Sequence, residues 1–400
     1  MNRILCIRDE KTAERELLKI NVSSGGIESM APKMDGICLK LENVRLPAAN
    51  ILKQEMLSLG GDAAVARGVV NGEVPISDVI LIGNAMKLKR LTAKLSYQQY
   101  FGLPHIRNDI LLLLSNQQGE KFSSIELNGK NLDLSRTRIM GILNITPDSF
   151  SDGNIFFDTE IAIKRGLEMA SEGADIIDIG GESTRPGAEG ISAKEELRRV
   201  IPVIEGIRQK SDILISIDTQ KAKVARSAIN AGADIVNDIS ALLTDPEMVN
   251  VLKENEQIGL IMMHKQGTPQ NMQNNPHYDD VIREVSDFLA ERITFCNEND
   301  INSRRIIVDP GIGFGKRHED NLMILQHLRE FHCLDCVLLL AASRKSFIGR
   351  IYESEPSERN SGTLASSAIA SQNGAHIVRV HEINNNRQLL ATLAAIKEQK

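Results

Sequence analysis

Eight short apolar runs, rich in β-branched residues, recur from residue 138 onward and alternate with longer amphipathic segments. The runs are 138–145, 174–181, 213–218, 234–240, 259–264, 304–311, 337–343 and 375–381. The intervening segments, for example 159–170 and 220–231, place apolar residues at helical spacing. Such alternation indicates a parallel sheet covered by helices. Eight units within roughly 260 residues predict an α/β chain whose main part is a closed (β/α)₈ TIM barrel.

Polar or charged residues stand at or near the carboxyl end of six of these eight runs. Active sites of barrels are built at that end, from residues at the ends of several strands. The repetition therefore predicts a functional site at the barrel mouth. The six residues are Asn144, Asp218, Asn237, His264, Asp309 and His381.

The first 130 residues lack this pattern and contain no recognisable catalytic cluster. We expect them to form a smaller N-terminal α/β or α+β domain, joined through the polar stretch 128–138 to a catalytic barrel of residues 131–400. The expected strands are 37–44 and 78–84, the expected helices are 47–59 and 86–95, and 109–124 is expected to be a pair of strands.

Composition excludes several classes of protein. The chain has 47 Lys and Arg against 53 Asp and Glu, so it lacks the basic character of a nucleic-acid binder. No apolar run is long enough for a signal peptide or a membrane span, so we expect no membrane partner. The five cysteines are odd in number and scattered, which favours reduced thiols and a cytoplasmic location. The lone C-x-x-C of Cys333 and Cys336 also allows a redox pair or half a zinc site.

Two loops carry groups suited to a metal-bound phosphate. The loop 146–154, T-P-D-S-F-S-D-G-N, contains Asp148 and Asp152 and follows Asn144. These hard oxygen ligands suit Mg²⁺. The loop 180–188, G-G-E-S-T-R-P-G-A, combines glycines and hydroxyl groups with Arg185, which suits an anion.

The remaining strand ends divide by chemistry. Asp218, Asn237 and Asp309 suit a fused heterocycle with N–H donors, whereas the cations suit a di- or polyphosphate. Ser343 has no base near it in the sequence, which disfavours covalent catalysis. The cationic side chains are Arg185, Lys345, Arg379 and His381.

These segments together resemble a known family. G-I-L-N-I-T-P-D-S-F-S-D-G (141–153) and D-I-G-G-E-S-T-R-P-G-A (178–188) resemble the two signature segments of dihydropteroate synthase, a folate-pathway transferase and sulfonamide target. The family's later motifs follow in order. They are S-I-D-T (216–219), N-D-I-S (237–240), M-H-K-Q-G-T-P (263–269), D-P-G-I-G-F-G-K (309–316), S-R-K-S-F-I-G (343–349) and R-V-H-E (379–382). The resemblance covers about residues 138–400, and residues 1–137 look like the extension that some bacterial members carry.

The resemblance implies a reaction. The family joins 7,8-dihydropterin-6-ylmethyl diphosphate to p-aminobenzoate and releases pyrophosphate, usually as a homodimer with Mg²⁺. The resemblance implies that three residues are catalytic, namely Asp218, Asp309 and Lys345. It also implies that these three residues hold the pterin together with Asn237, Met263, Phe314 and Arg379. Asn144, Asp148 and Asp152 would hold Mg²⁺, and Arg185, Arg379 and His381 would take the diphosphate. The p-aminobenzoate site would be framed by Phe150, Thr184, Pro186, Ser343 and Lys345.

Two positions depart from the family's pattern, and two other functions stay open. Lys265 stands where the family usually has Met, and Ala341 stands where it usually has Gly, which predicts a narrower floor of the pterin pocket. A pterin-binding methyltransferase would share Asp218, Asn237 and Asp309 but would need no diphosphate clamp. A non-catalytic paralogue would bind a pterin or a partner without turnover.

Overall fold

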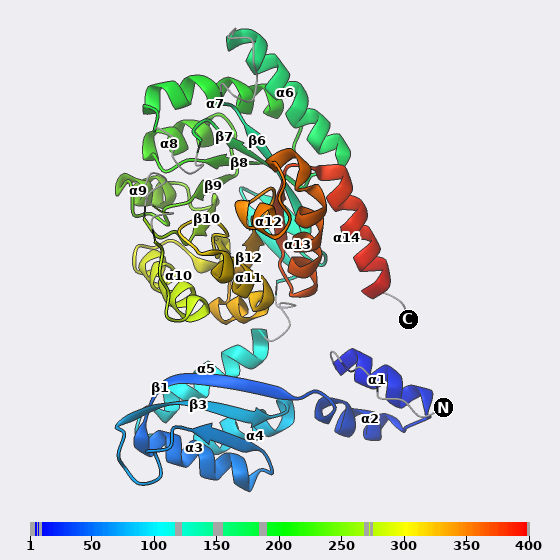
Figure 1. Ribbon diagram of the computed structural model, residues 1–400, viewed down its shortest axis with the longest axis vertical. Coiled ribbons are helices and arrows are strands. Elements are labelled where there is room, and N and C mark those ends of the chain that lie inside the picture. Colours follow the sequence, from blue (N-terminus) through cyan, green and yellow to red (C-terminus); the bar gives the residue numbers. More distant parts are fainter. Residues whose placement is uncertain are drawn as a thin grey trace. The chain divides into compact units, whose positions relative to one another are not determined.

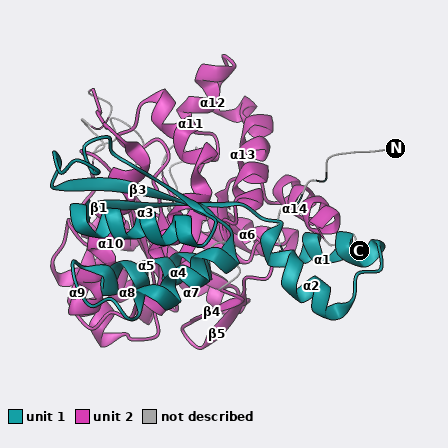
Figure 2. Ribbon diagram, turned by 90° about the horizontal axis from the view of Figure 1, so that it is seen from below, with its two compact units in different colours: residues 1–117 teal, residues 118–400 magenta. Residues whose placement is uncertain are grey.

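The computed structural model describes residues 5, 7, 10–116, 122–146, 155–183, 190–267, 272 and 275–397. The chain forms two compact units, residues 1–117 and residues 118–400, which Figure 2 colours separately. Each unit has its own apolar core. The two units are therefore described one at a time.

The first unit is built around a three-stranded antiparallel sheet with the strand order β1-β3-β2. One face of this sheet is buried, as the alternation of buried and exposed residues along β3 shows. The buried face packs in one apolar cluster with α3, α4 and α5. The elements of the unit are α1 (Glu10–Lys19), α2 (Ser24–Met30), the 3₁₀ turn η1 (Ala31–Lys33), β1 (Ile37–Arg45), α3 (Leu46–Ser58), β2 (Asp62–Val65), β3 (Ile76–Gly83), α4 (Ala85–Leu95) and α5 (Leu103–Asn116).

The strand pair expected at 109–124 is wrong, because residues 109–116, the first half of this segment, belong to helix α5. Leu103 and Ile110 are fully buried in the sheet's cluster, and Ile106, Leu113 and Leu114 pack against it. Spacings of three, four and seven residues place these side chains on one helical face. Leucine is also a strong helix former, and the strand prediction gave this too little weight.

The second unit contains the closed eight-stranded parallel barrel that the sequence predicts (Figure 1). Successive strands are neighbours around the ring, and the eighth strand, β13, pairs with the first, β6. The strands are β6 (Arg138–Asn144), β7 (Ile176–Gly180), β8 (Leu214–Asp218), β9 (Ile235–Asp238), β10 (Gly259–Met263), β11 (Ile306–Asp309), β12 (Val337–Leu340) and β13 (Ile377–Val380).

Helices form the outer layer of the barrel (Figure 1). Polar side chains cap several of them; Ser192, for example, accepts from the backbone N–H of Glu195 at 3.2 Å at the start of α7. The helices are α6 (Ile155–Glu172), α7 (Ala193–Arg208), α8 (Ala222–Asn230), α9 (Glu247–Glu254), α10 (Val281–Glu298), α11 (His318–Gln326), α12 (Ser346–Ile351), α13 (Asn360–Gln372) and α14 (Ile383–Lys397). Short 3₁₀ segments are η3 (Ser303–Arg305), η4 (Leu328–Leu334) and η5 (Pro356–Glu358).

A hairpin of β4 (Ser124–Leu127) and β5 (Lys130–Asp133) precedes the barrel. Its turn residues, Asn128 and Gly129, both have positive φ, as a two-residue hairpin turn requires. Its apolar side chains join one cluster with the first inward-facing residues of the barrel strands, so the hairpin closes the amino-terminal end of the barrel. The sequence-based boundary between 130 and 131 would cut this hairpin, whereas the compact units divide at 117/118.

The two G-A-D segments of the sequence have a structural role at this closed end. Gly173 and Gly232 follow helices α6 and α8 with φ of 105° and 111°, so each reverses the chain where other residues would be strained. Asp234 accepts from the backbone N–H of Ile215 and pairs with Arg208 at 2.6 Å. It also pairs with Lys130 of the hairpin at 3.1 Å, which ties β5 to the barrel.

Within the described ranges, no helix is both long and apolar enough to span a bilayer. Four cysteines lie in the described part of the chain and form no disulfide bond there, namely Cys38, Cys296, Cys333 and Cys336.

A truncation tests the role of the hairpin. We expect the fragment 118–400 to fold, and the fragment 131–400 to lose stability, because the second lacks β4 and exposes the barrel end that Ile125 and Leu127 cover. Loss of two buried aliphatic side chains costs about 4–10 kcal/mol. Thermal unfolding of both fragments, followed by circular dichroism, measures the difference. Equal melting temperatures would show that the hairpin is dispensable.

Candidate active site

Five of the six polar strand-end residues face the barrel interior because of the two-residue period of a strand. The exception is His264, which follows the inward Met263 and instead packs against Phe288 of the outer helix α10. The inward side chains near the closed end are apolar and include Ile176, Ile235, Ile261, Ile307 and Ile377. Two residues further along each strand, the same inward face carries a functional side chain. These are Asp178, Asn237, Met263, Asp309 and Arg379. On β8 the functional residue is Asp218, which lies four residues after the apolar Leu214.

Arg379 links the carboxylates of two neighbouring strands. Its Nε donates to Asp178 Oδ2 at 2.6 Å, and its Nη2 donates to Asp218 Oδ2 at 2.7 Å. Asn237 Nδ2 donates to the same Asp178 oxygen at 3.2 Å. The fold therefore brings together Asp218, Asn237 and Arg379, three of the predicted residues, and adds Asp178.

Asn144 and Asp218 approach each other across Gly180. The three residues stand side by side in the registers of β6, β7 and β8. A Cβ atom on Gly180 would lie 3.4 Å from Asn144 Oδ1 and 3.9 Å from Asp218 Oδ2. Gly180 therefore lies directly between the side chains of Asn144 and Asp218, and Asn144 is only partly buried at the end of β6.

The segment 309–316 is fixed against the end of β10. Asp309 Oδ1 accepts from the backbone N–H of Gly311 at 2.8 Å. A Cβ atom on Gly311 would lie 1.9 Å from the carbonyl oxygen of His264, so only glycine allows this backbone contact. The buried Lys316 Nζ lies 2.8 Å from His264 Nδ1. These contacts hold Asp309 at the mouth before any ligand binds.

Lys345 and Phe314 form one wall of the mouth. Lys345 Nζ lies 3.9 Å from the centroid of the Phe314 ring, a cation–π distance. Phe314 packs with Met263, Ile239 and Met272 in a small apolar cluster. No ion pair joins Lys345 to Asp309 among the described residues, so their direct pairing is not part of this structure.

Ser343 has a base beside it, contrary to what its sequence neighbours indicated. Ser343 Oγ lies 2.9 Å from His381 Nδ1, and the hydroxyl also accepts from the backbone N–H of His381 at 3.3 Å. The two residues end consecutive strands, and this topology brings them together over 38 residues of sequence.

Burial of these charges shifts their protonation equilibria. Burial raises the pKa of Asp218 to about 7, Arg379 opposes the shift, and Asp178 adds to it. Burial also raises the pKa of Asp309. Burial and then the charge of Arg379 lower the pKa of Lys345 to about 8. Perturbed groups that converge in one mouth are typical of an active site.

The two departures from the family's pattern lie at different depths. Lys265 Nζ donates to Gln220 Oε1 at 2.6 Å, in the loop that follows β8. Ala341 is buried in the apolar cluster that fills the barrel beneath the mouth. Six predicted residues lie outside the described part of the chain, namely Asp148, Phe150, Asp152, Thr184, Arg185 and Pro186.

Sequence reasoning missed two residues of the site. Asp178 lies in the middle of a buried apolar run. A carboxylate in such a place needs partners, and this interruption of the run is the sequence signal that could have identified it. Lys316 closes the D-P-G-I-G-F-G-K motif but was given no role. Burial lowers the pKa of Lys316 to about 7, with Asp309 opposing the shift.

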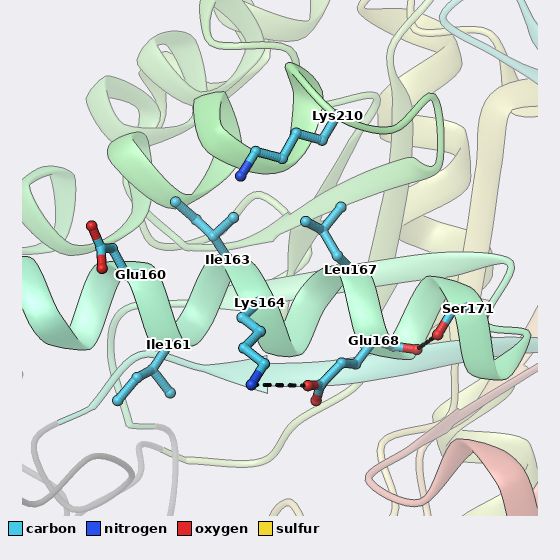
Figure 3. Close-up of a pocket in the computed structure, with 8 residues that line it drawn as sticks. All are labelled: Glu160, Ile161, Ile163, Lys164, Leu167, Glu168, Ser171 and Lys210. Atoms are coloured by element: carbon cyan, nitrogen blue, oxygen red, sulfur yellow. Dashed lines mark hydrogen bonds and ion pairs between the residues drawn. The ribbon is translucent and has the colours of Figure 1, made fainter.

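A separate surface hollow lies on the outer side of helix α6 and beside Lys210 (Figure 3). Its lining is largely Ile163, Leu167 and an ion pair of Lys164 and Glu168 at 3.9 Å. None of the predicted site residues lines it, so it is not the site described above.

Comparisons with known proteins agree with this geometry. A family model described as pterin binding enzyme matches residues 140–381. Dihydropteroate synthase of Escherichia coli K12 is 46% identical over 276 residues, which is 68% of this chain and 97% of that protein. The structure of Xanthomonas albilineans dihydropteroate synthase with 4-aminobenzoic acid aligns with a TM-score of 0.66 and 41% identity, covering 70% of this chain and 99% of that one.

The barrel with a polar mouth and the matching family model define a pterin-binding enzyme. Within that class, the chain belongs to the dihydropteroate synthase family. Its activity is that of a dihydropteroate synthase, a transferase of folate biosynthesis.

A third relative shows that the first unit is shared in part. A probable bifunctional folylpolyglutamate synthase/dihydropteroate synthase of Haloferax volcanii is 40% identical over 347 residues, which is 84% of this chain and 41% of that protein. A match of this length exceeds the second unit, so it includes part of residues 1–117.

The lowered pKa of Lys345 predicts that this residue destabilises the free protein. Between about pH 8 and 10.5 the unfolded chain binds a proton at this lysine that the folded chain has lost, so stability rises with pH across that window. We expect Lys345→Met to be more stable than the unchanged protein near pH 7, with a difference that narrows toward pH 10. Chemical denaturation at both pH values tests this, and an equal or lower stability of the variant at neutral pH would contradict it.

Proposed function

We propose that the barrel mouth condenses 7,8-dihydropterin-6-ylmethyl diphosphate with p-aminobenzoate, giving 7,8-dihydropteroate and pyrophosphate. The observation that carries this proposal is the convergence of Asp218, Asn237, Asp309 and Arg379 on the inward face of the upper barrel, with Lys345 on its wall. Acceptors for N–H groups and donors for oxyanions meet there in one buried place.

The pterin ring fits the acceptor side of the mouth. Asp309 and Asn237 offer oxygens to the N–H groups of the ring, and Lys345 offers a donor to its carbonyl or a ring nitrogen. Met263 and Phe314 supply apolar surface for the two faces of the ring. Ala341 belongs to the apolar cluster that fills the barrel below the mouth, and its methyl group is proposed to narrow the floor of the pterin pocket.

Asn144 is suited to a Mg²⁺ ion bound with the diphosphate. Asn144 is partly buried at the end of β6, and Mg²⁺ in phosphate sites takes one or two protein oxygens and completes its shell with phosphate and water. No cluster of three acidic, His or Cys side chains suited to a metal occurs in the described ranges. Asp148 and Asp152 remain the proposed further ligands. When bound, the ion would neutralise charge on the departing pyrophosphate.

The reaction breaks the C–O bond between the pterin methylene and the diphosphate, and the oxygen takes the electron pair. Positive charge then develops on the methylene and the ring, where Asp309 and Asp218 are already fixed, which is electrostatic stabilisation by preorganised groups. The lone pair of the p-aminobenzoate nitrogen forms the new C–N bond, and that nitrogen releases a proton. Arg379 and His381, with Arg185, are proposed to hold the leaving oxygens.

The p-aminobenzoate site is proposed beside Ser343, framed also by Phe150, Thr184, Pro186 and Lys345. The related X. albilineans enzyme was crystallised with 4-aminobenzoic acid, which supports an arylamine site in this family. Ser343 acts there as a hydrogen-bonding group and not as a nucleophile, because the arylamine itself supplies the attacking electron pair.

One assay separates this function from the alternatives. Pyrophosphate release that requires both the pterin diphosphate and p-aminobenzoate identifies the synthase. A methyltransferase would instead consume a methylated pterin, and a non-catalytic paralogue would bind the pterin without releasing pyrophosphate.

Asp309→Asn tests the proposed electrostatic role. The substitution keeps the shape of the side chain but removes its charge, so we expect turnover to fall about 10- to 150-fold, corresponding to roughly 1.5–3 kcal/mol for one charged hydrogen bond. The Michaelis constant for p-aminobenzoate should change little, because the charge matters most as the diphosphate departs. Unchanged turnover with a raised p-aminobenzoate constant would refute the role.

Asn144→Ala tests the proposed metal contact. We expect a higher Mg²⁺ concentration for half-maximal activity, by about tenfold, since one of few protein ligands is lost. The melting temperature should stay within a few degrees, because Asn144 is polar and only partly buried at the end of β6. Steady-state rates across a Mg²⁺ titration give the answer, and an unchanged requirement would remove Asn144 from the metal site.

The barrel is proposed to dimerise through α11, α12 and α13. Four exposed apolar side chains lie on these helices, namely Leu322, Met323, Ile351 and Ile369, and the exposed Tyr352 directly follows α12. A helix rich in Ala and Ser such as α13 allows close approach of a partner. We expect dimers by light scattering at micromolar concentration, and monomers for Ile369→Glu with an unchanged circular dichroism spectrum. A monomeric unchanged protein would count against the proposal.

A further inference from the structure

Asp178 is a fully buried carboxylate to which the proposed reaction gives no step. It lies in the middle of β7, on the inward face of the barrel, with 0% of its side chain exposed. Burying a charged group without strong partners is costly, and apolar residues of similar size would fill such a place more stably. Its presence therefore needs an explanation other than stability.

Both of its contacts are with proposed pterin-binding residues. Oδ2 of Asp178 accepts from Arg379 Nε at 2.6 Å and from Asn237 Nδ2 at 3.2 Å. Oδ1 is buried and has no hydrogen-bond partner among the described residues. The carboxylate therefore acts on two side chains from β13 and β9 through a single oxygen.

These contacts determine which atoms the two side chains present to the mouth. An amide has one oxygen acceptor and one nitrogen donor, and the nitrogen of Asn237 is directed to Asp178. Its oxygen is therefore left for the N–H groups of a ligand. The guanidinium of Arg379 is held at Nε by Asp178 and at Nη2 by Asp218, so its plane is fixed from two sides.

We propose that Asp178 is a positioning residue that sets the acceptor orientation of Asn237 and the plane of Arg379, and so selects a ring with N–H donors. The inference rests on the proposed function, because it assumes that Asn237 and Arg379 bind the pterin. Asp178 itself touches no substrate, since its side chain is inaccessible. It acts before the pterin arrives, so its effect is on the affinity for the pterin diphosphate.

Asp178→Asn is the direct test. The variant keeps the side-chain shape but offers Arg379 and Asn237 an uncharged oxygen. We expect the Michaelis constant for the pterin diphosphate to rise about 10- to 100-fold, as for the loss of a charge-assisted hydrogen bond, while that for p-aminobenzoate stays within about twofold. An unchanged pterin constant in a folded, active variant would overturn the proposal.

Ser216→Ala is the matched control. Ser216 is the register neighbour of Asp178 on β8, is also fully buried, and has an Oγ without a hydrogen-bond partner in the described part of the chain. Its removal disturbs the same layer of the barrel but no contact to Arg379 or Asn237. We expect both Michaelis constants to stay unchanged. If the Michaelis constant for the pterin diphosphate rises equally in both variants, the effect comes from disturbing this layer of the barrel and not from the contacts of Asp178.

The pH profile supplies a readout that a merely structural role would not move. The charged groups that act on Asp218 are Arg379, Asp178, Glu196, Asp238 and Lys345. Asp178 raises the pKa of Asp218, so its neutralisation should lower that pKa and move the acidic limb of kcat/KM for the pterin diphosphate to lower pH. The limb should stay in place in Ser216→Ala. A limb that does not move in Asp178→Asn would count against the coupling.

Failure of the proposed function and misfolding of the variant can both be distinguished from failure of the proposal for Asp178. If the unchanged protein releases no pyrophosphate with both substrates, the proposed function fails and not the role of Asp178. If Asp178→Asn does not fold, a crystal structure of the unchanged protein with a bound pterin decides. Retention of both contacts to Asp178 Oδ2 supports the proposal, and their loss on binding overturns it.

Discussion

The ion pairs of Arg379 with Asp178 and Asp218 are the interaction on which the site depends. Three strands, β13, β7 and β8, contribute one residue each to this bridge. Burial of any one of these charges alone in a barrel interior would be strongly destabilising, whereas together they compensate one another. The cost of assembling them remains visible in the raised pKa of Asp218 and the lowered pKa of Lys345. The mouth is thus electrostatically prepared for a substrate that carries both N–H donors and an anionic leaving group.

Stability and chemistry occupy opposite ends of the barrel. The β4–β5 hairpin and the apolar first layer of the strands close one end, and Asp234 binds the hairpin to the barrel through Lys130. The other end carries polar residues on the inward faces of several strands, such as Asp178, Asn237 and Asp309, each two residues beyond the apolar layer. This division lets the closed end supply the stability that the charged mouth reduces.

The sequence predicted much of the fold and part of the site. The eight strands were predicted from apolar runs, because a strand covered on both faces leaves a nearly continuous apolar signal. Helix α5 was missed because a short leucine-rich run fits either structure locally. The hairpin was missed although Asn128-Gly129 is a strong turn signal, because a polar stretch between two units suggested a linker. Residues such as Asp309 and Lys345 were found because each interrupts an apolar pattern, and Asp178 was passed over within a signature motif.

The sequence by itself therefore determined the barrel, the end of it that carries the chemistry, and the family. Strand period, strand order and residue type are local properties, and they suffice for those conclusions. Only the tertiary structure decided the partners: Ser343 with His381, Lys316 with His264, and Asp178 with Arg379 and Asn237. Each pair joins residues at least 38 positions apart. Their hydrogen bonds depend on ring closure and on side-chain packing, which no local pattern in the chain encodes.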